Sequence, residues 1–295
     1  MATAFATTPA RARGGRAAGR FRTTRLLGLV ARHAILIAVA IMVLLPIAII
    51  AATALMDPSQ VLNGDLIPNP ITLDNFPKVL QAIPFLRYFA NTVIIATLTT
   101  VATLLSSVPA AYALGTLRFP GRRAIFLLVV AAMILPGQVT VIPMYVMFAH
   151  LGWVGTPLPL VVPPLLMDAF SIFLLRQFFI TVPRSYLESA RLDGASELQI
   201  LIRVFLPMVR SAVAAVALFA FFYAWNDYFN PLLYLGSNSD WYTLSVALAN
   251  FRTAHGVEWN LMMAATLIFI LPVIVVFFFA QKVFVEGISL TGVKG

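Results

Sequence analysis

Six long apolar segments alternate with polar stretches along the chain, and this alternation is the dominant pattern of the sequence. They cover about residues 33–55, 88–115, 124–149, 158–181, 208–234 and 260–282. Each is longer than the roughly 20 residues that a helix needs to cross the hydrocarbon core of a bilayer. Because a spanning segment must satisfy its own backbone hydrogen bonds, we expect each to be a helix. The pattern predicts an all-α, polytopic membrane protein with six transmembrane helices.

The composition supports an integral membrane protein. The chain has 295 residues, of which 61% are hydrophobic and 11% are charged, whereas a soluble domain carries about 25% charged residues. The net charge of +9 comes from basic residues distributed along the membrane topology rather than on one soluble face, which argues against nucleic-acid binding. The chain has no cysteine, so disulfides and thiolate metal sites are excluded, whereas the redox compartment stays open.

The N-terminal region combines a basic stretch with an apolar one. Seven arginines and no acid precede the first apolar segment, which predicts a disordered, cytoplasmic anchoring tail. A secretory signal peptide is the alternative. However, the apolar run from Ala34 to Leu55 has 22 residues, longer than the apolar region of a signal peptide, and further spans follow it. We therefore expect a retained first transmembrane helix.

The distribution of lysine and arginine predicts the orientation. With the N-terminus in the cytoplasm, sixteen of these residues fall on the cytoplasmic side and three outside, and cytoplasmic loops carry the excess of positive charge. The predicted layout is a basic cytoplasmic tail (1–32), a first transmembrane helix (33–56), an irregular, turn-rich extracytoplasmic loop (57–86), a core with five transmembrane helices (87–282) and a cytoplasmic C-terminal tail (283–295).

A polar island of mixed charge, residues 188–207, separates two apolar segments on the predicted cytoplasmic side. Gly194 interrupts it and can adopt a positive φ that other residues resist. Leu206 precedes Pro207, and a proline disfavours helical geometry at the residue before it, so we expect the helix to stop there. The pattern predicts two short helices joined at a glycine over residues 185–203, a shape suited to docking in a groove on a partner.

The polar island resembles the "EAA" signature of ABC-importer permease subunits, whose pattern is Glu-Ala-Ala, a spacer, Gly, and then Ile-x-Leu-Pro. The matching residues are Glu188, Ser189, Ala190, Asp193, Gly194, Ala195, Leu206 and Pro207. Two positions depart from the pattern: Ser189 replaces the middle alanine, and Val204-Phe205-Leu206 only approximates the Ile-x-Leu ending. The resemblance implies that these residues couple the chain to an ATPase subunit.

Two further stretches resemble carbohydrate-importer permeases of the maltose-permease type. The first is Trp225-Asn226-Asp227-Tyr228 followed by Asn230-Pro231-Leu232, and the second runs from Phe284 to Ile288 with Gly292-Val293-Lys294-Gly295. The resemblance covers roughly residues 70–295 and implies the type I ABC importer permease fold. It also implies a multi-pass location in a bacterial plasma (inner) membrane.

The resemblance further implies a set of partners: a second permease subunit, two copies of an ATP-binding subunit, an extracytoplasmic solute-binding protein and a carbohydrate substrate. ATP and Mg would bind the partner ATPase, and this chain would bind no cofactor and catalyse no covalent chemistry. The residues agree, because the chain has no Gly-x-x-x-x-Gly-Lys-Ser/Thr phosphate loop. Its three histidines also lack metal-ligand spacing.

Polar residues near the fifth and fourth segments are candidates for the translocation pathway. Asp168 and Asp227 are expected near the outer ends of their segments, because a charge at the bilayer centre costs about 2.5–3.5 kcal/mol. Trp225, Asn226 and Tyr228 flank Asp227 and offer the aromatic faces and amides that hold sugars. An interfacial location and an aromatic belt explain the same residues, so both interpretations stay open.

Two other classes of function compete with the importer. A secondary transporter driven by an ion gradient would need ionisable groups near the bilayer midplane, and only Arg176 approaches that position. A membrane scaffold or receptor would leave the polar island without an ATPase partner.

Overall fold

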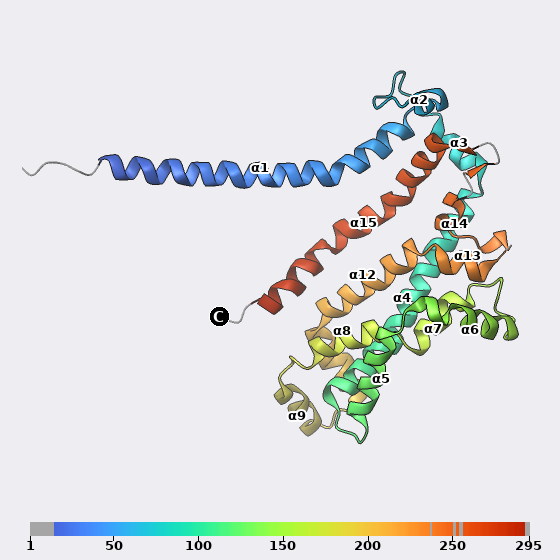
Figure 1. The fold of residues 1–295 in the computed structure, drawn as a ribbon. Coiled ribbons are helices and arrows are strands. Elements are labelled where there is room, and N and C mark those ends of the chain that lie inside the picture. The colour runs from blue at the N-terminus through green and yellow to red at the C-terminus, as the bar shows by residue number, and fades with distance from the viewer. Residues whose placement is uncertain (1–14, 237, 250–251, 254–255, 293–295) are drawn as a thin grey trace, which may run out of the picture.

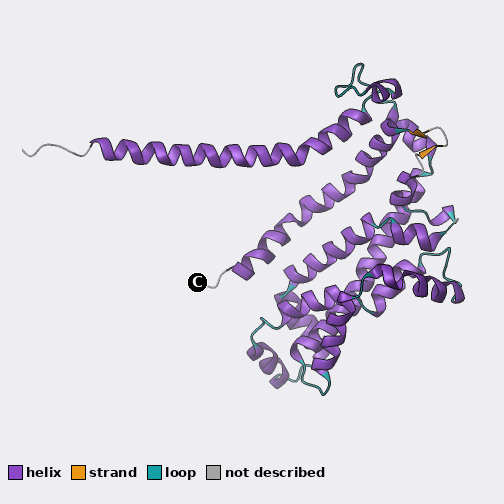
Figure 2. Cartoon of the chain, in the orientation of Figure 1, coloured by secondary structure: helices purple, strands orange, loops and turns teal. Residues whose placement is uncertain are grey.

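A computed structural model describes residues 15–236, 238–249, 252–253 and 256–292. Helices make up most of this part of the chain (Figures 1 and 2). In chain order the α-helices are α1 (Gly15–Ala54), α2 (Pro58–Asn63), α3 (Asn75–Ala82), α4 (Phe85–Thr116), α5 (Arg122–Ile134), α6 (Gly137–His150), α7 (Leu158–Leu166), α8 (Ala169–Phe179), α9 (Arg184–Leu192), α10 (Glu197–Gln199), α11 (Leu206–Met208), α12 (Arg210–Asn226), α13 (Phe229–Leu235), α14 (Leu244–Ala249) and α15 (Trp259–Gly292). A π-helix, η1 (Ile200–Phe205), a 3-10 helix, η2 (Ser239–Trp241), and a two-stranded antiparallel pair, β1 (Arg252–Thr253) and β2 (Gly256–Val257), complete the described elements.

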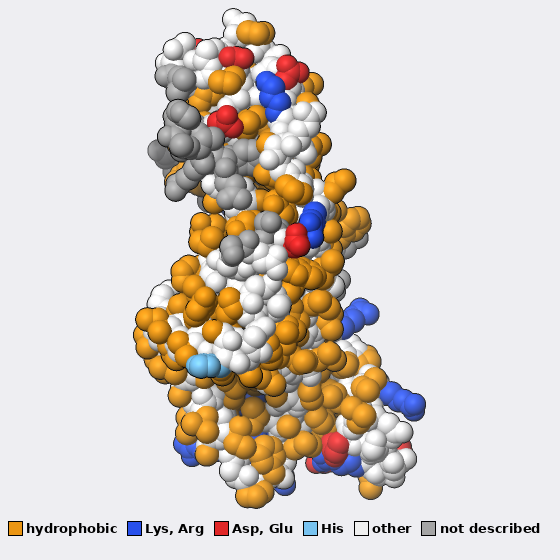
Figure 3. All heavy atoms as spheres, turned by 90° about the vertical axis from the view of Figure 1, so that its right-hand side faces the viewer, with side chains coloured by type: hydrophobic (Ala, Val, Ile, Leu, Met, Phe, Trp, Pro, Cys, Tyr) orange, Lys and Arg blue, Asp and Glu red, His pale blue; other side chains and the backbone are white. Residues whose placement is uncertain are grey.

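The expected all-α membrane architecture is confirmed. Among the described residues, four segments are helical, long and apolar enough to cross a bilayer, and they are Gly28–Ala54, Phe85–Thr116, Leu158–Phe179 and Trp259–Phe279. Two sharply bent helix pairs raise the number to as many as six. Hydrophobic side chains cover most of the molecular face in Figure 3, and charged ones are few. Such a surface suits lipid or partner helices rather than water.

The third expected span, 124–149, is not one continuous helix. It consists of α5 and α6, which meet at 98°. Leu135 is extended, with φ −69° and ψ 118°, because it precedes Pro136 and a proline excludes the helical region for the residue before it. Since α5 has 13 residues and α6 has 14, each is only about 20 Å long.

The fifth expected span, 208–234, is also divided. Helix α12 ends at Asn226, Asp227 is extended with φ −67° and ψ 118°, and α13 begins at Phe229. At its other end α12 follows Glu197–Met208 at an angle of 86°. The carboxylate of Asp227 caps α13, and this competing hydrogen bonding at the start of a new helix ends the old one.

Helix α4 forms the centre of the body and packs against α7, α8 and α12 (Figure 1). Small residues permit these close approaches, because a missing side chain lets two helix backbones come together. Gly115 is the clearest case, since a Cβ added there would lie 3.3 Å from the Cβ of Phe179 on α8. Ala96 and Ala111 on the same helix are fully buried.

Helix α1 reaches away from this body (Figure 1). Every described side chain from residue 28 to residue 49 is exposed. The helix already begins at Gly15, so the expectation of a disordered tail is wrong for residues 15–32. Alanine, arginine and leucine, which are strong helix formers, are common there, and no proline interrupts the run before Pro46.

The C-terminal end of α1 is tied to α3 and α15 by a buried polar side chain. Asn75 Nδ2 donates to the carbonyl oxygens of Ala54 at 2.9 Å and Met56 at 2.8 Å. Asn260 Nδ2 on α15 donates to Asn75 Oδ1 at 2.8 Å. The loop 57–86 is therefore more regular than expected. It contains the whole of α2 and α3, and Asp57 and Gln60 form a capping box at the start of α2.

Candidate functional site

The polar island folds into two short helices that project from the end of the body formed by α4 and α8. Helix α9 is followed by Gly194, then α10, the π-helix η1 and α11. We call residues 184–199, from the start of α9 to the end of α10, the elbow. In Figure 1, α9 lies at the opposite end of the molecule from α2 and α14. The predicted helix–glycine–helix arrangement is confirmed.

Gly194 forms the joint of the elbow with φ +79°. The backbone around it makes a Schellman motif: Ala195 N donates to Ala190 O at 3.1 Å, and Gly194 N donates to Arg191 O at 3.0 Å. Ser196 then starts α10 with a capping box, in which its hydroxyl accepts from Gln199 N. One helix thus ends and the next begins within a few residues, so the angle between them is defined by backbone hydrogen bonds.

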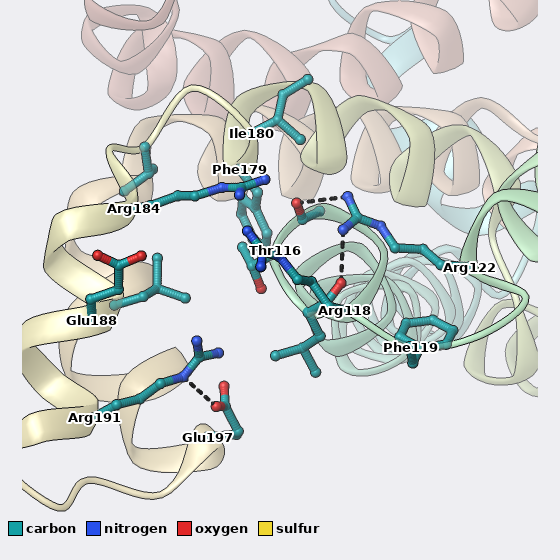
Figure 4. Close-up of a pocket in the computed structure, with 14 residues that line it drawn as sticks. Thr116, Arg118, Phe119, Arg122, Phe179, Ile180, Arg184, Glu188, Arg191 and Glu197 are labelled. Atoms are coloured by element: carbon teal, nitrogen blue, oxygen red, sulfur yellow. Dashed lines mark hydrogen bonds and ion pairs between the residues drawn. The ribbon is translucent and has the colours of Figure 1, made fainter.

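A polar clamp holds the elbow closed and attaches it to α4. Arg191 Nε donates to Glu197 Oε1 at 2.8 Å across the joint, and Tyr112 Oη of α4 donates to Glu197 Oε2 at 2.7 Å (Figure 4). Both carboxylate oxygens are therefore occupied. The hydrogen bond to Glu197 raises the pKa of the Arg191 guanidinium above its already high value, so this cation stays charged. Each such charge-assisted bond is stronger than a neutral one.

Apolar side chains anchor the elbow and η1 to the body. Leu187 and Ile200 are buried, and Phe205 is fully buried. The ring of Phe205 makes edge-on contacts with Tyr112, at 5.1 Å between centroids, and with Phe179, at 5.6 Å. Phe205 therefore packs η1, which directly follows the elbow, against both α4 and α8.

The outer surface of the elbow carries the motif residues. Glu188, Ser189, Asp193 and Gly194 are exposed, whereas Ala190 and Ala195 are half-buried against the body. Leu192 is 89% exposed and Leu198 is 65% exposed. Exposed leucines beside charged residues form the kind of surface that a partner protein covers.

The helix does not stop at Leu206, contrary to expectation. Leu206 is helical, with φ −55° and ψ −44°, and Pro207 lies inside α11. The π-helix η1 immediately precedes them, and Pro207 stands in the first turn of α11, where its missing N–H is tolerated. The chain bends only after Val209, which has φ −112° and ψ 18°.

The candidate pathway residues do not form one group. Trp225 is 1% exposed and packs among Phe89, Phe221 and Phe269, with centroid distances of 6.1, 5.5 and 5.7 Å. It braces the packing of α4, α12 and α15. Asn226 and Tyr228 are exposed, and Asn226 Nδ2 donates to its own helix at Phe222 O.

The two candidate carboxylates both cap helices. Asp227 accepts from Asn230 N at 3.2 Å and from Asn230 Nδ2 at 2.8 Å. Asp168 accepts from Ser171 N at 2.7 Å at the start of α8. Its expected location near the outer end of a span is wrong, since it lies at the α7–α8 break in the middle of Leu158–Phe179. Helix capping places a carboxylate there, because it satisfies backbone N–H groups that the break leaves free.

The sequence did not predict the clamp formed by Tyr112, Arg191 and Glu197. It also did not predict that Tyr223 lies near the carboxylates of Asp227 and Asp168. Tyr223 is 70% exposed and interacts electrostatically with both Asp227 and Asp168. Tyr223 lies in the last turn of α12, four residues before Asp227, and this short separation in the sequence was a usable signal. Within the part of the chain that the structure describes, no group of three His, Cys, Asp or Glu side chains could hold a metal ion.

Comparisons with known proteins agree with this architecture. Residues 107–290 match the family model described as "Binding-protein-dependent transport system inner membrane component". The arabinooligosaccharide transport permease of Halalkalibacterium halodurans is 31% identical over 229 residues, which cover 77% of this chain and 81% of the relative. The sn-glycerol-3-phosphate transport permease of Yersinia pestis is 31% identical over 266 residues, which cover 87% and 94%.

A solved structure shows the same fold. A chain of a bacterial ABC transporter that imports the acidic polysaccharide alginate superposes with a TM-score of 0.77 at 27% identity, covering 93% of this chain and 99% of that one. The fold is therefore that of an ABC importer permease, and the ATPase of such a system is a separate chain. The protein is a multi-pass membrane protein and belongs to the family of inner-membrane components of binding-protein-dependent transport systems, as the non-enzymatic permease subunit of an ABC importer.

Proposed function

We propose that this permease subunit imports a carbohydrate and receives the energy of ATP hydrolysis through the elbow. Two of the three relatives described above act on saccharides by name, an arabinooligosaccharide and alginate, and the third on a phosphorylated triol. The partners would be a second permease subunit, two copies of an ATP-binding subunit that holds ATP and Mg, and an extracytoplasmic solute-binding protein.

The observation that carries the coupling role is the rigid attachment of the elbow to the helical body. The Schellman motif sets its angle, the Arg191–Glu197–Tyr112 clamp ties it to α4, and Phe205 seats it against α8. Closure of the ATPase dimer would push on the exposed surface around Glu188 and Leu192. Because the elbow has several attachments to the body, it would turn α4 and α8 rather than bend.

The orientation that fits this mechanism has both termini and the elbow in the cytoplasm. The arginines Arg118, Arg122, Arg184 and Arg191 gather at the elbow end of the body, as the excess of positive charge on cytoplasmic segments requires. The opposite end, with α2 and α14, would meet the solute-binding protein.

The translocation pathway would follow the face where α7 meets α8 and α12 meets α13. Asn226, Tyr228 and Tyr223 are exposed there, and Asp227 and Asp168 stand at the two helix breaks. These groups offer the hydrogen-bonding and aromatic surfaces that sugars use, while Trp225 supports them from behind. Membership of the family leaves the two other classes, a gradient-driven secondary transporter and a membrane scaffold or receptor, without support.

The test is uptake by cells that carry Gly194→Val or Glu188→Lys in this chain. Both variants should insert and assemble but lose sugar uptake, because valine resists φ +79° at the joint and lysine reverses a charge on the docking surface. Gly64→Val is the matched control. It imposes the same strain at the same φ, +79°, also with open space around it, at the other end of the molecule.

Wild-type uptake with both elbow variants would disprove the coupling role. If Gly64→Val lost as much uptake as Gly194→Val, the loss in Gly194→Val would be a general effect of backbone strain and not a specific effect on the elbow.

A further inference from the structure

A cavity of about 510 Å³ opens beside the elbow, between the end of α4, the α8–α9 connection and α9. Six of the fourteen residues that line it are charged (Figure 4). They are Arg118, Arg122, Arg184, Arg191, Glu188 and Glu197. The coupling role proposed above uses Glu188, Arg191 and Glu197 of this wall and gives no role to Arg118 and Arg184.

Two of the four arginines are already engaged. Arg191 pairs with Glu197 at 2.8 Å. The guanidinium of Arg122 donates to three carbonyl oxygens at the end of α4, those of Leu114 at 2.8 Å, Gly115 at 3.0 Å and Leu117 at 2.7 Å. These two arginines have structural partners and are not available for a ligand.

The side chains of Arg118 and Arg184 have no hydrogen bond or ion pair with any residue in the described part of the chain. Both side chains point into the cavity, from opposite walls, and their guanidinium groups converge (Figure 4). Two like charges that face one another repel unless an anion lies between them. Glu188 is the remaining unpaired acid of the wall, so the three unpaired groups keep a net positive charge.

The position of the cavity relative to the membrane narrows the choice of anion. Its wall includes Thr116 and Phe179, the last residues of the spanning segments Phe85–Thr116 and Leu158–Phe179. The cavity therefore lies at the level where the bilayer ends, which is the level of lipid headgroups.

An apolar flank adjoins the basic wall. Ile180, which lines the cavity, is 48% exposed. A second cavity of about 760 Å³ shares Phe119 and Arg122 with the first and is also lined by Phe126 and Leu127. Free phosphate would use only the guanidinium groups, whereas a phospholipid would use the guanidinium groups and this apolar flank together.

We propose that Arg118 and Arg184 bind the phosphate headgroup of an anionic phospholipid, whose acyl chain lies along Ile180 and Phe119. Guanidinium groups bind phosphate oxygens through charge-assisted hydrogen bonds, and basic pockets at the ends of membrane helices bind such headgroups. The orientation proposed above puts this lipid in the cytoplasmic leaflet of the membrane. The proposal that the two arginines bind a lipid does not depend on that orientation.

The experiment measures lipid bound to the delipidated complex of this chain with its partner subunits, by native mass spectrometry during titration with phosphatidylglycerol or phosphatidylcholine. Arg118→Gln/Arg184→Gln should weaken phosphatidylglycerol binding about twenty-five-fold, because each arginine near an anionic surface contributes about a factor of five. Arg118→Lys/Arg184→Lys should retain it. Arg210→Gln, which removes an exposed arginine outside the cavity wall, should bind as the wild type does.

Three outcomes would overturn the proposal. One is equal phosphatidylglycerol binding by the glutamine variant and the wild type, and the second is displacement of the lipid by millimolar inorganic phosphate, which would identify a free-anion site. The third is loss of the ATP-binding subunits from the glutamine variant with lipid binding intact, which would assign the arginines to the protein interface.

If the double variant fails to assemble, each single glutamine variant is measured instead, and unchanged binding in both would equally overturn the proposal. Because lipid binding is measured without transport, its failure is distinguishable from failure of the proposed import function.

Discussion

Replacing Tyr112 with phenylalanine would loosen the elbow without disturbing its packing. The substitution removes the hydroxyl that donates to Glu197 at 2.7 Å, while the ring keeps its edge-on contact with Phe205 at 5.1 Å. A hydrogen bond to a charged group contributes about 1.5–3 kcal/mol when it is buried. The side chain of Glu197 is 44% exposed, so water replaces part of the loss and we expect about 1 kcal/mol.

Hydrogen exchange of the elbow amides measures this loss directly. A change of about 1 kcal/mol corresponds to local opening roughly five times more frequent at residues 194–199. The coupling of ATP hydrolysis to sugar uptake in proteoliposomes should fall in parallel, because a looser elbow moves without turning α4.

Tyr186→Phe is the control for this prediction. Tyr186 also lies at the elbow, on α9, is 51% exposed, and its hydroxyl makes no hydrogen bond within the described residues. Equal exchange at the elbow in Tyr112→Phe, Tyr186→Phe and the wild type would refute the assignment of a clamp. Faster exchange in both variants would show that the effect does not depend on the bond to Glu197.

Further predictions concern the body, the pathway and the topology. Gly115→Val should destabilise the purified protein by about 1–3 kcal/mol in a thermal melt, because the valine side chain would collide with Phe179. Gly137→Val is the control and should not destabilise the protein, because there is open space around Gly137. Asn226→Ala or Asp227→Ala should reduce sugar uptake more than assembly with the partner subunits, and failure of these two variants to assemble would make the residues structural. Trp225→Ala should reduce assembly more than uptake, because it leaves a cavity at a buried site. A reporter fused after Lys294 should behave as cytoplasmic and one inserted near Asn63 as extracytoplasmic, and the opposite signals would reverse the proposed orientation.

Local signals in the sequence were sufficient for the helical, membrane-spanning character of the chain and for the joint of the elbow. Gly194 stands between two helical patterns, and its positive φ follows from the freedom of glycine there. The clamp could not be predicted in this way, since Tyr112 and Glu197 are 85 residues apart and meet only because α4 passes beside η1. Contacts between distant segments depend on how helices pack, and that packing has no signature in one sequence.

The breaks inside the membrane spans could not be predicted from the sequence either. Pro136 was visible within the apolar run 124–149, yet proline is also tolerated inside membrane helices, so the 98° bend did not follow from the sequence. The position of Asp168 in the apolar segment 158–181 predicts a location near the outer end of a span, either interfacial or lining the pathway. The structure instead uses the Asp168 carboxylate to cap α8 at 2.7 Å from Ser171 N, which offsets part of the cost of a charge inside a span.

The exposed surface of α1 has a consequence for biogenesis. None of the apolar window in Gly28–Ala54 is buried inside the protein, and within the described part of the chain the hydrogen bond and buried contacts that join the helix to α3 and α15 lie at its C-terminal end, around Ala54 and Asn75. A helix of this kind is stable in a bilayer by its own backbone hydrogen bonds and lipid contacts. We therefore expect α1 to enter the membrane first during synthesis and to remain there as a separate element, so that its final position is set when a neighbouring subunit or lipid occupies the space beside it.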